Sequence, residues 1–123
     1  MWRFVFIAFL MAHGAIHLAI WATPTPKEGK VPFDVNHSWL VGSQRSLAIL
    51  LAVVAAGCLV AAGLGLWIEG PWWRTIAVAG LASSLGLMIL FFHTWFLPIQ
   101  ILNVALLVGL LWSEWPSEAM VGV

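Results

Sequence analysis

The sequence predicts an all-α integral membrane protein, an up-down bundle of four transmembrane helices. Hydrophobic residues make up 63% of the 123 residues and charged residues only 8%, whereas about 25% of a typical soluble domain is charged. Four apolar runs approach or exceed the length needed to cross roughly 30 Å of bilayer hydrocarbon. None of them alternates apolar and polar residues as barrel strands do. These observations exclude an ordinary water-soluble globular protein.

The four expected spans make one transmembrane domain over residues 1–123. They cover residues 4–22, 46–68 with 39 as an alternative start, 73–92, and 98–115 with 95 as an alternative start. The first helix ends at Thr23-Pro24-Thr25-Pro26, because proline lacks the amide hydrogen and clashes with the preceding turn. The second and third helices are separated at Glu69-Gly70-Pro71, with glycine past one helix and proline at the start of the next.

Nine tryptophans support these limits, since indole prefers the membrane–water interface. They bracket the spans and are Trp2, Trp21, Trp39, Trp67, Trp72, Trp73, Trp95, Trp112 and Trp115. None of them falls in the middle of an expected span. The pattern therefore favours an interfacial belt over a buried core of indoles.

The N-terminal run is expected to be a retained helix and not a cleaved signal peptide. It is long for the apolar region of a signal, and Ile20-Trp21-Ala22 is a poor cleavage site. Arg3 and Arg74 lie closest to span ends, on the side that holds the N-terminus. Because positive charges stay in the cytoplasm, we expect both termini on the cytoplasmic side.

The charge balance and the cysteine content exclude several classes of partner and cofactor. Five basic and five acidic residues cancel, so the chain has no basic footprint for nucleic acid. The single cysteine, Cys58, cannot form an internal disulfide, and the chain has no cysteine-based metal motif. The expected partners are the lipid bilayer and other membrane-protein subunits, or a second copy of the chain.

Small residues recur every four positions along the expected helices, for example at Gly57, Ala61 and Gly65. They allow helix backbones to approach closely in lipid. This spacing predicts packing within the bundle; the alternative is that one such stripe meets another protein.

Polar residues within the spans are costly in lipid and mark either function or bonds between helices. In an up-down bundle the first and third loops lie on the same side, and counting residues from the span ends places most of these groups in that half of the bundle or at its midplane. They are His13, His17, His37, Arg45, His93, Gln100 and Asn103. His13 and His17, four residues apart, share one helix face. This half is the expected functional half.

Four interpretations of this half stay open. In the first, the polar residues bond between helices and to loop carbonyls. In the second, His17 and His93 hold a haem b, with Arg45 on a propionate. In the third, zinc or copper binds to His13 and His17 with His93 or His37. In the fourth, a lipid or quinone headgroup binds in a pocket lined by His17, Arg45, Gln100 and Asn103.

Two stretches carry a resemblance to other proteins. Ala12-His13-Gly14-Ala15-Ile16-His17-Leu18 and Gly70-Pro71-Trp72-Trp73-Arg74 resemble a group of small bacterial four-span membrane proteins, some labelled as transporter permeases. The resemblance implies a stand-alone four-helix unit in the bacterial cytoplasmic (inner) membrane, and it implies no activity. The sequence itself has no phosphate-binding loop and no inverted-repeat pair of helices that would support transport.

The sequence therefore predicts a non-catalytic membrane protein, either an accessory subunit of a larger membrane complex or a binder of an apolar ligand. Ser83 and Ser84 lie in packing stretches without an evident base, so a hydrolase is not expected. No cofactor is predicted. The alternative is a redox membrane protein that holds haem b or a transition metal on its histidines.

Overall fold

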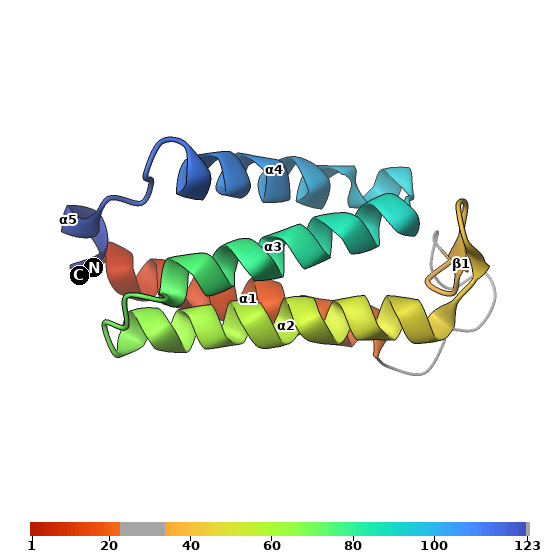
Figure 1. Cartoon of the computed structure of the whole chain (residues 1–123), viewed down its shortest axis with the longest axis horizontal. Helices are drawn as coiled ribbons and strands as arrows, with labels where there is room; N and C mark the ends of the chain where they lie inside the picture. Colours follow the sequence, from red (N-terminus) through yellow and green to blue (C-terminus); the bar gives the residue numbers. More distant parts are fainter. Residues whose placement is uncertain (23–33, 123) are drawn as a thin grey trace.

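The computed structural model describes residues 1–22 and 34–122. Four long helices run almost side by side, with short elements at both ends (Figure 1). In chain order the elements are α1 Trp2–Trp21, β1 His37–Ser38, β2 Gly42–Ser43, α2 Arg45–Trp67, α3 Trp73–Leu90, the 3-10 helix η1 Thr94–Phe96, α4 Leu97–Leu111 and α5 Glu118–Val121. Both termini lie at one end of the bundle, and β1 lies at the other (Figure 1).

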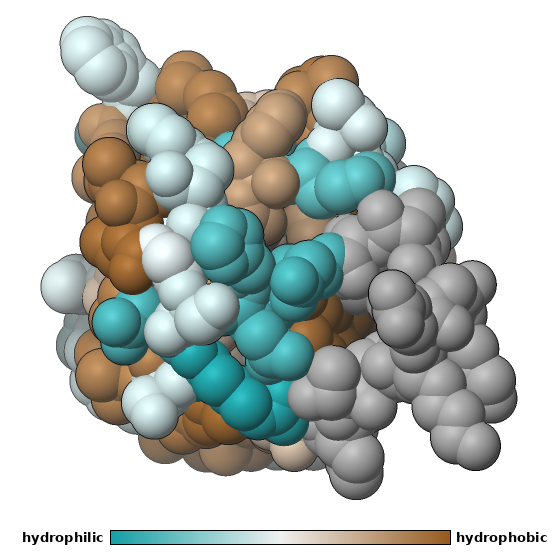
Figure 2. Space-filling view, turned by 90° about the vertical axis from the view of Figure 1, so that its right-hand side faces the viewer, coloured by the Kyte–Doolittle hydropathy of each residue, from teal (hydrophilic) through white to brown (hydrophobic). Residues whose placement is uncertain are grey.

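The arrangement confirms the predicted all-α four-helix bundle. Four helices are long and apolar enough to cross a membrane: Trp2–Trp21, Arg45–Trp67, Trp73–Leu90 and Thr94–Leu111. α1 packs along α2, α2 along α3, and α4 chiefly against α3. We call the end with β1 the loop end, and the end with both termini the terminal end. Hydrophilic side chains gather in the middle of the loop end, and hydrophobic side chains flank them (Figure 2).

The start of the second helix decides between the two predicted boundaries. α2 begins at Arg45, so the start at 46 is nearly right and the alternative start at 39 is wrong. Residues 37–43 instead form a small antiparallel hairpin, in which His37 pairs with Ser43 and Ser38 with Gly42. The hairpin is fixed to α3, because the Ser38 hydroxyl and the Trp39 indole donate hydrogen bonds to Leu90 O and Ile89 O.

Glycines set how closely the helices approach. A Cβ on Gly80 of α3 would lie 2.9 Å from Leu59 Cγ and 3.1 Å from Leu59 N of α2. A Cβ on Gly14 of α1 would lie 3.0 Å from Ala56 O of α2. Gly57, in contrast, has nothing within 4 Å of an added Cβ. Small residues therefore pack α1, α2 and α3 together, while Gly57 faces outward.

The tryptophan belt is only partly as predicted. Seven tryptophans are at least 43% exposed near helix ends, but Trp21 and Trp73 are 1% and 3% exposed. Trp21 follows His17 by one helical turn on the inner face of α1, and its ring packs against Phe96 with centroids 5.2 Å apart. The belt prediction is therefore wrong for Trp21 and Trp73, because helix periodicity turns both rings into the bundle.

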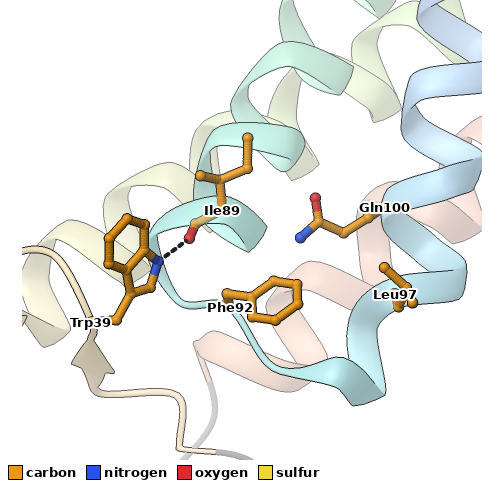
Figure 3. A pocket seen from close by; sticks show the side chains of 5 residues that line it. All are labelled: Trp39, Ile89, Phe92, Leu97 and Gln100. Carbon is orange, nitrogen blue, oxygen red and sulfur yellow. Dashed lines mark hydrogen bonds between the residues drawn. The ribbon is translucent and has the colours of Figure 1, made fainter.

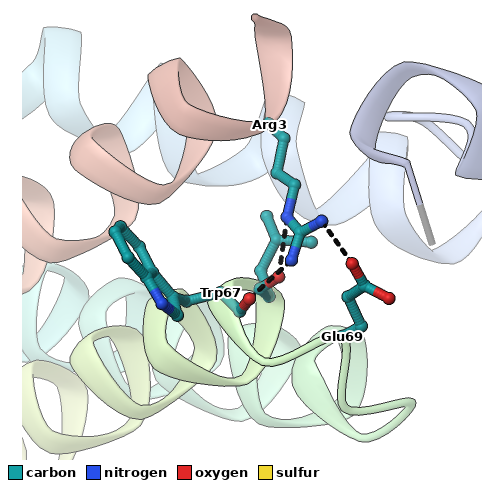
Figure 4. A network of polar contacts seen from close by, with 4 residues as sticks. Arg3, Trp67 and Glu69 are labelled. Atoms are coloured by element: carbon teal, nitrogen blue, oxygen red, sulfur yellow. Dashed lines mark hydrogen bonds and ion pairs between the residues drawn. The ribbon is translucent and has the colours of Figure 1, made fainter.

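Arg3 links the start of α1 to the end of α2 at the terminal end (Figure 4). Its guanidinium donates to Leu66 O and Trp67 O, two carbonyls in the last turn of α2. It also forms an ion pair with Glu69 at 2.7 Å. The positive charge thus lies where the helix dipole of α2 is negative.

Candidate functional site

A closed ring of hydrogen bonds joins three helices in the interior of the bundle. His13 Nε2 lies 2.9 Å from Asn103 Oδ1, and Asn103 Nδ2 lies 2.8 Å from Ser84 Oγ. Ser84 Oγ lies 2.7 Å from His17 Nε2, and His17 Nδ1 lies 2.8 Å from His13 O. We call these four residues the polar ring.

Chemistry assigns a direction to every bond of the polar ring. A backbone carbonyl only accepts, so His17 Nδ1 must donate to His13 O. With that imidazole neutral, His17 Nε2 accepts from the Ser84 hydroxyl. The Ser84 oxygen in turn accepts from Asn103 Nδ2, and Asn103 Oδ1 accepts from His13 Nε2. Each atom named in these four bonds therefore has a partner within the polar ring.

The polar ring is shielded from the surroundings. His17, Ser84 and Asn103 are each 0% exposed, and His13 is 8% exposed. Because a polar group in lipid is costly unless it is bonded, the ring stabilises the register of α1, α3 and α4 relative to one another. This is the arrangement described by the first of the four interpretations.

Aromatic rings continue the same face of α1 above and below the polar ring. Phe9 stacks on His13 with an interplanar angle of 16°, and His17 stacks on Trp21 with an angle of 24°. The predicted shared face of His13 and His17 is therefore present and points inward. Trp21 Nε1 is buried and has no hydrogen-bond partner among the residues that the structure describes.

The other predicted residues lie apart from the polar ring. Arg45 is the first residue of α2 and donates to Asn36 Oδ1 at 2.7 Å. His37 is exposed in the hairpin, 3.4 Å from Ser43 Oγ through Nδ1. His93 Nδ1 accepts from Trp95 N at 3.0 Å and caps η1. Arg45 is the first residue of α2 and therefore lies at the helix end, whereas the alternative helix start at residue 39 would have placed it six residues into the helix.

The histidines do not gather into a metal site. Among residues 1–22 and 34–122, no three or more His, Cys, Asp or Glu side chains come together in a way that could hold a metal ion. For haem, each candidate axial ligand would need a free ring lone pair. The lone pair of His17 faces the Ser84 hydroxyl, and that of His93 Nδ1 faces Trp95 N.

A pocket does lie beside the predicted residue Gln100 (Figure 3). Its volume is about 420 Å³, and it is lined by Trp39, Ile89, Phe92, Leu97 and Gln100. Gln100 Nε2 donates to Met88 O at 3.0 Å, and its amide projects from α4 toward α3 (Figure 3). Gln100 Oε1 has no described partner, so an apolar pocket contains one available acceptor. We call it the Gln100 pocket.

Sequence reasoning missed Ser84, the residue that connects the polar ring. Ser84 lies six residues before the end of α3, which is a depth comparable to that of His17 in α1. Counting from the helix end could have found it. The expectation that Ser84 has no adjacent base is wrong, since His17 bonds to it; the described contacts add no carboxylate to this pair.

Comparison of the chain with protein-family models, with curated proteins and with solved structures gives no match.

Proposed function

We propose that the protein is a non-catalytic membrane protein that binds an apolar ligand, a quinol or a lipid, in the Gln100 pocket. The observation that carries this proposal is the single amide acceptor in a pocket whose other lining side chains are Trp39, Ile89, Phe92 and Leu97. Ligand pockets typically combine apolar walls with a few polar groups that fix orientation. The polar ring supports the proposal indirectly, because it holds α4 and therefore Gln100 against α3.

The chemistry of the pocket favours a ligand that donates a hydrogen bond. Gln100 Nε2 is already bonded to Met88 O, whereas Gln100 Oε1 is available. A hydroquinone or a lipid hydroxyl can donate to this oxygen, but a quinone carbonyl cannot. Trp39 and Phe92 supply aromatic faces suited to a planar ring.

Binding of small probes to the purified protein in detergent tests this proposal. The probes are a decyl-substituted hydroquinone, the corresponding benzoquinone and dioctanoylglycerol, with affinity measured by calorimetry. The hydroquinone and the glyceride should bind more tightly than the quinone. Gln100→Leu should weaken them about fivefold, the scale of one hydrogen bond of about 1 kcal/mol. Saturable binding of none of the three probes would contradict the proposal.

Gln44→Leu is the matched control, because Gln44 is exposed at the N-cap of α2 and does not line the pocket. It should leave all three affinities unchanged. Equal losses in Gln44→Leu and Gln100→Leu would assign the effect to general destabilisation and would contradict a role for the pocket. Thermal unfolding of both variants is measured alongside.

We also propose that the protein resides in the bacterial cytoplasmic membrane with both termini in the cytoplasm. Support comes from the resemblance to bacterial four-span proteins and from Arg3 and Arg74 at the terminal end. Reporter fusions at the C-terminus and at residue 36 should be active on the cytoplasmic and the outer side, respectively. The reverse pattern would overturn the orientation. The role as an accessory subunit stays a prediction.

A further inference from the structure

A second cavity lies at the terminal end of the bundle and is polar. Its volume is about 690 Å³. Its polar lining comes from α3 and from the segment that follows α4, and consists of Arg74, Ser113, Glu114, Ser117 and Glu118. We call it the terminal cavity. It is distinct from the Gln100 pocket, with which it shares no lining residue.

The charges around the terminal cavity do not neutralise one another. Arg74 donates from Nη2 to Pro116 O at 2.8 Å and from Nη1 to Leu110 O at 3.4 Å, so its guanidinium is held by backbone carbonyls. The contacts of the described residues give an ion pair of Arg3 with Glu69 at this end, and none between Arg74 and Glu114 or Glu118. One cation and the carboxylates of Glu114 and Glu118 therefore line the same cavity without forming an ion pair.

The terminal cavity lies at the level at which we expect the lipid headgroups. Arg74 lies in the first turn of α3, and Glu114 lies just past the end of α4, so both lie at the ends of helices that are long and apolar enough to cross a membrane. Trp112 and Trp115 mark the same level with exposed indoles, 85% and 44% exposed. Leu111 lies on the apolar edge of the cavity.

An apolar path leads from the cavity along the outward side of α4. Leu111, Val108, Val104 and Ile101 are 63%, 51%, 47% and 63% exposed. Their spacing of three and four residues places them on one helix face. A molecule that carries its charges in the terminal cavity can therefore lay acyl chains along α4 toward the bilayer centre.

We propose that the terminal cavity binds the headgroup of a phospholipid that contains both a phosphate and a primary ammonium group, as in phosphatidylethanolamine. The phosphate faces the Arg74 guanidinium, which suits an anion with several acceptor oxygens. The ammonium faces Glu114 and Glu118 and can donate three hydrogen bonds to them. A quaternary trimethylammonium group has no hydrogen to donate, so the site should discriminate between the two headgroups.

The test uses the full chain in detergent micelles and counts bound lipid by native mass spectrometry. Phosphatidylethanolamine and phosphatidylcholine with identical acyl chains are titrated separately. The first should bind about tenfold more tightly, the scale of one charge-assisted hydrogen bond. The double variant Glu114→Gln, Glu118→Gln should bind the two lipids with about equal affinity. Equal affinity of the two lipids for the unchanged protein would overturn the proposal.

Two controls separate the site from general effects. Glu69→Gln changes a carboxylate at the same end that does not line the cavity, and it should keep the lipid preference. A preference that survives in the double variant, or that is lost equally in Glu69→Gln, would overturn the assignment. Soluble phosphoethanolamine should not displace the lipid, even at concentrations at which the lipid itself saturates the protein. Effective displacement would identify the ligand as a soluble zwitterion and would also overturn the proposal.

Discussion

The hydroxyl group of Ser84 joins two other residues of the polar ring, His17 and Asn103. It accepts from Asn103 Nδ2 and lies within hydrogen-bond distance of His17 Nε2. Removing its oxygen leaves the lone pair of His17 and one hydrogen of Asn103 without a partner in a site with 0% exposure. Water cannot compensate them there, so the cost falls on the folded state.

Ser84→Ala should therefore lower the free energy of unfolding by about 1 to 2 kcal/mol, since hydrogen bonds between transmembrane helices average about 0.6 kcal/mol with a maximum of about 1.7 kcal/mol. Unfolding of the purified protein in mixed micelles with increasing SDS measures this. Ser83→Ala is the matched control, because Ser83 is only half-buried and has no described hydrogen bond. A loss at Ser83 as large as that at Ser84 would contradict the role of the polar ring.

The same residue marks the limit of sequence reasoning about the site. Helix periodicity places His13 and His17 on one face, and depth counting brings Asn103 to their level. Counting from the end of α3 would bring Ser84 to the same level, but it does not distinguish Ser84 from its neighbour Ser83, and serine is common in small-residue packing stretches. The rotation of α3 that turns Ser84 inward and leaves Ser83 half-buried depends on packing against α2, which the sequence alone does not specify.

At the scale of the elements, two glycines in similar sequence contexts have opposite surroundings. Gly80 lies where α3 meets α2, with the backbone nitrogen of Leu59 3.1 Å from its added Cβ. Gly57 of α2 has open space around it. The spacing of small residues predicts close helix approach but not which glycine makes it, because both positions fit the same four-residue pattern.

Gly80→Ala should lower the free energy of unfolding by about 1 to 2 kcal/mol, since overpacking costs about 1 to 3 kcal/mol and alanine returns up to about 1 kcal/mol of helix propensity. Gly57→Ala gains that propensity without a clash, so it should stabilise the helix by up to about 1 kcal/mol. The same SDS unfolding series measures both. A destabilising Gly57→Ala in the isolated protein would show that this face is packed after all.

At the scale of the whole molecule, the composition and the lengths of the apolar runs were sufficient to predict the architecture. The helices begin and end within about four residues of the predicted spans, and both termini lie at one end as an up-down bundle requires (Figure 1). The hairpin at residues 37–43 was not predicted, because the apolar run Trp39-Leu40-Val41 resembles the start of a membrane-spanning helix. In the structure these three residues lie in the hairpin and their side chains are exposed. Its position depends on two hydrogen bonds to carbonyls of α3.

At the same scale, the hydrogen bonds of His17 and His93 bear on whether the protein binds a cofactor. An iron or copper bond to an imidazole uses the ring lone pair, and His17 and His93 both direct theirs at donors of the protein. Binding haem at His17 would also break the polar ring that joins α1, α3 and α4. We therefore expect the purified protein to show no Soret band and no stoichiometric copper or zinc.

Absorption spectra with and without dithionite, together with elemental analysis of the same sample, measure this. The protein should be purified from cells supplied with a haem precursor and with both metals, so that loading is not limited by supply. A Soret band that shifts on reduction and is lost in His17→Ala would require the Ser84 hydroxyl to give up His17 Nε2, which it contacts at 2.7 Å. The polar ring would then be the unliganded form of a redox centre, and the protein would be a b-type cytochrome.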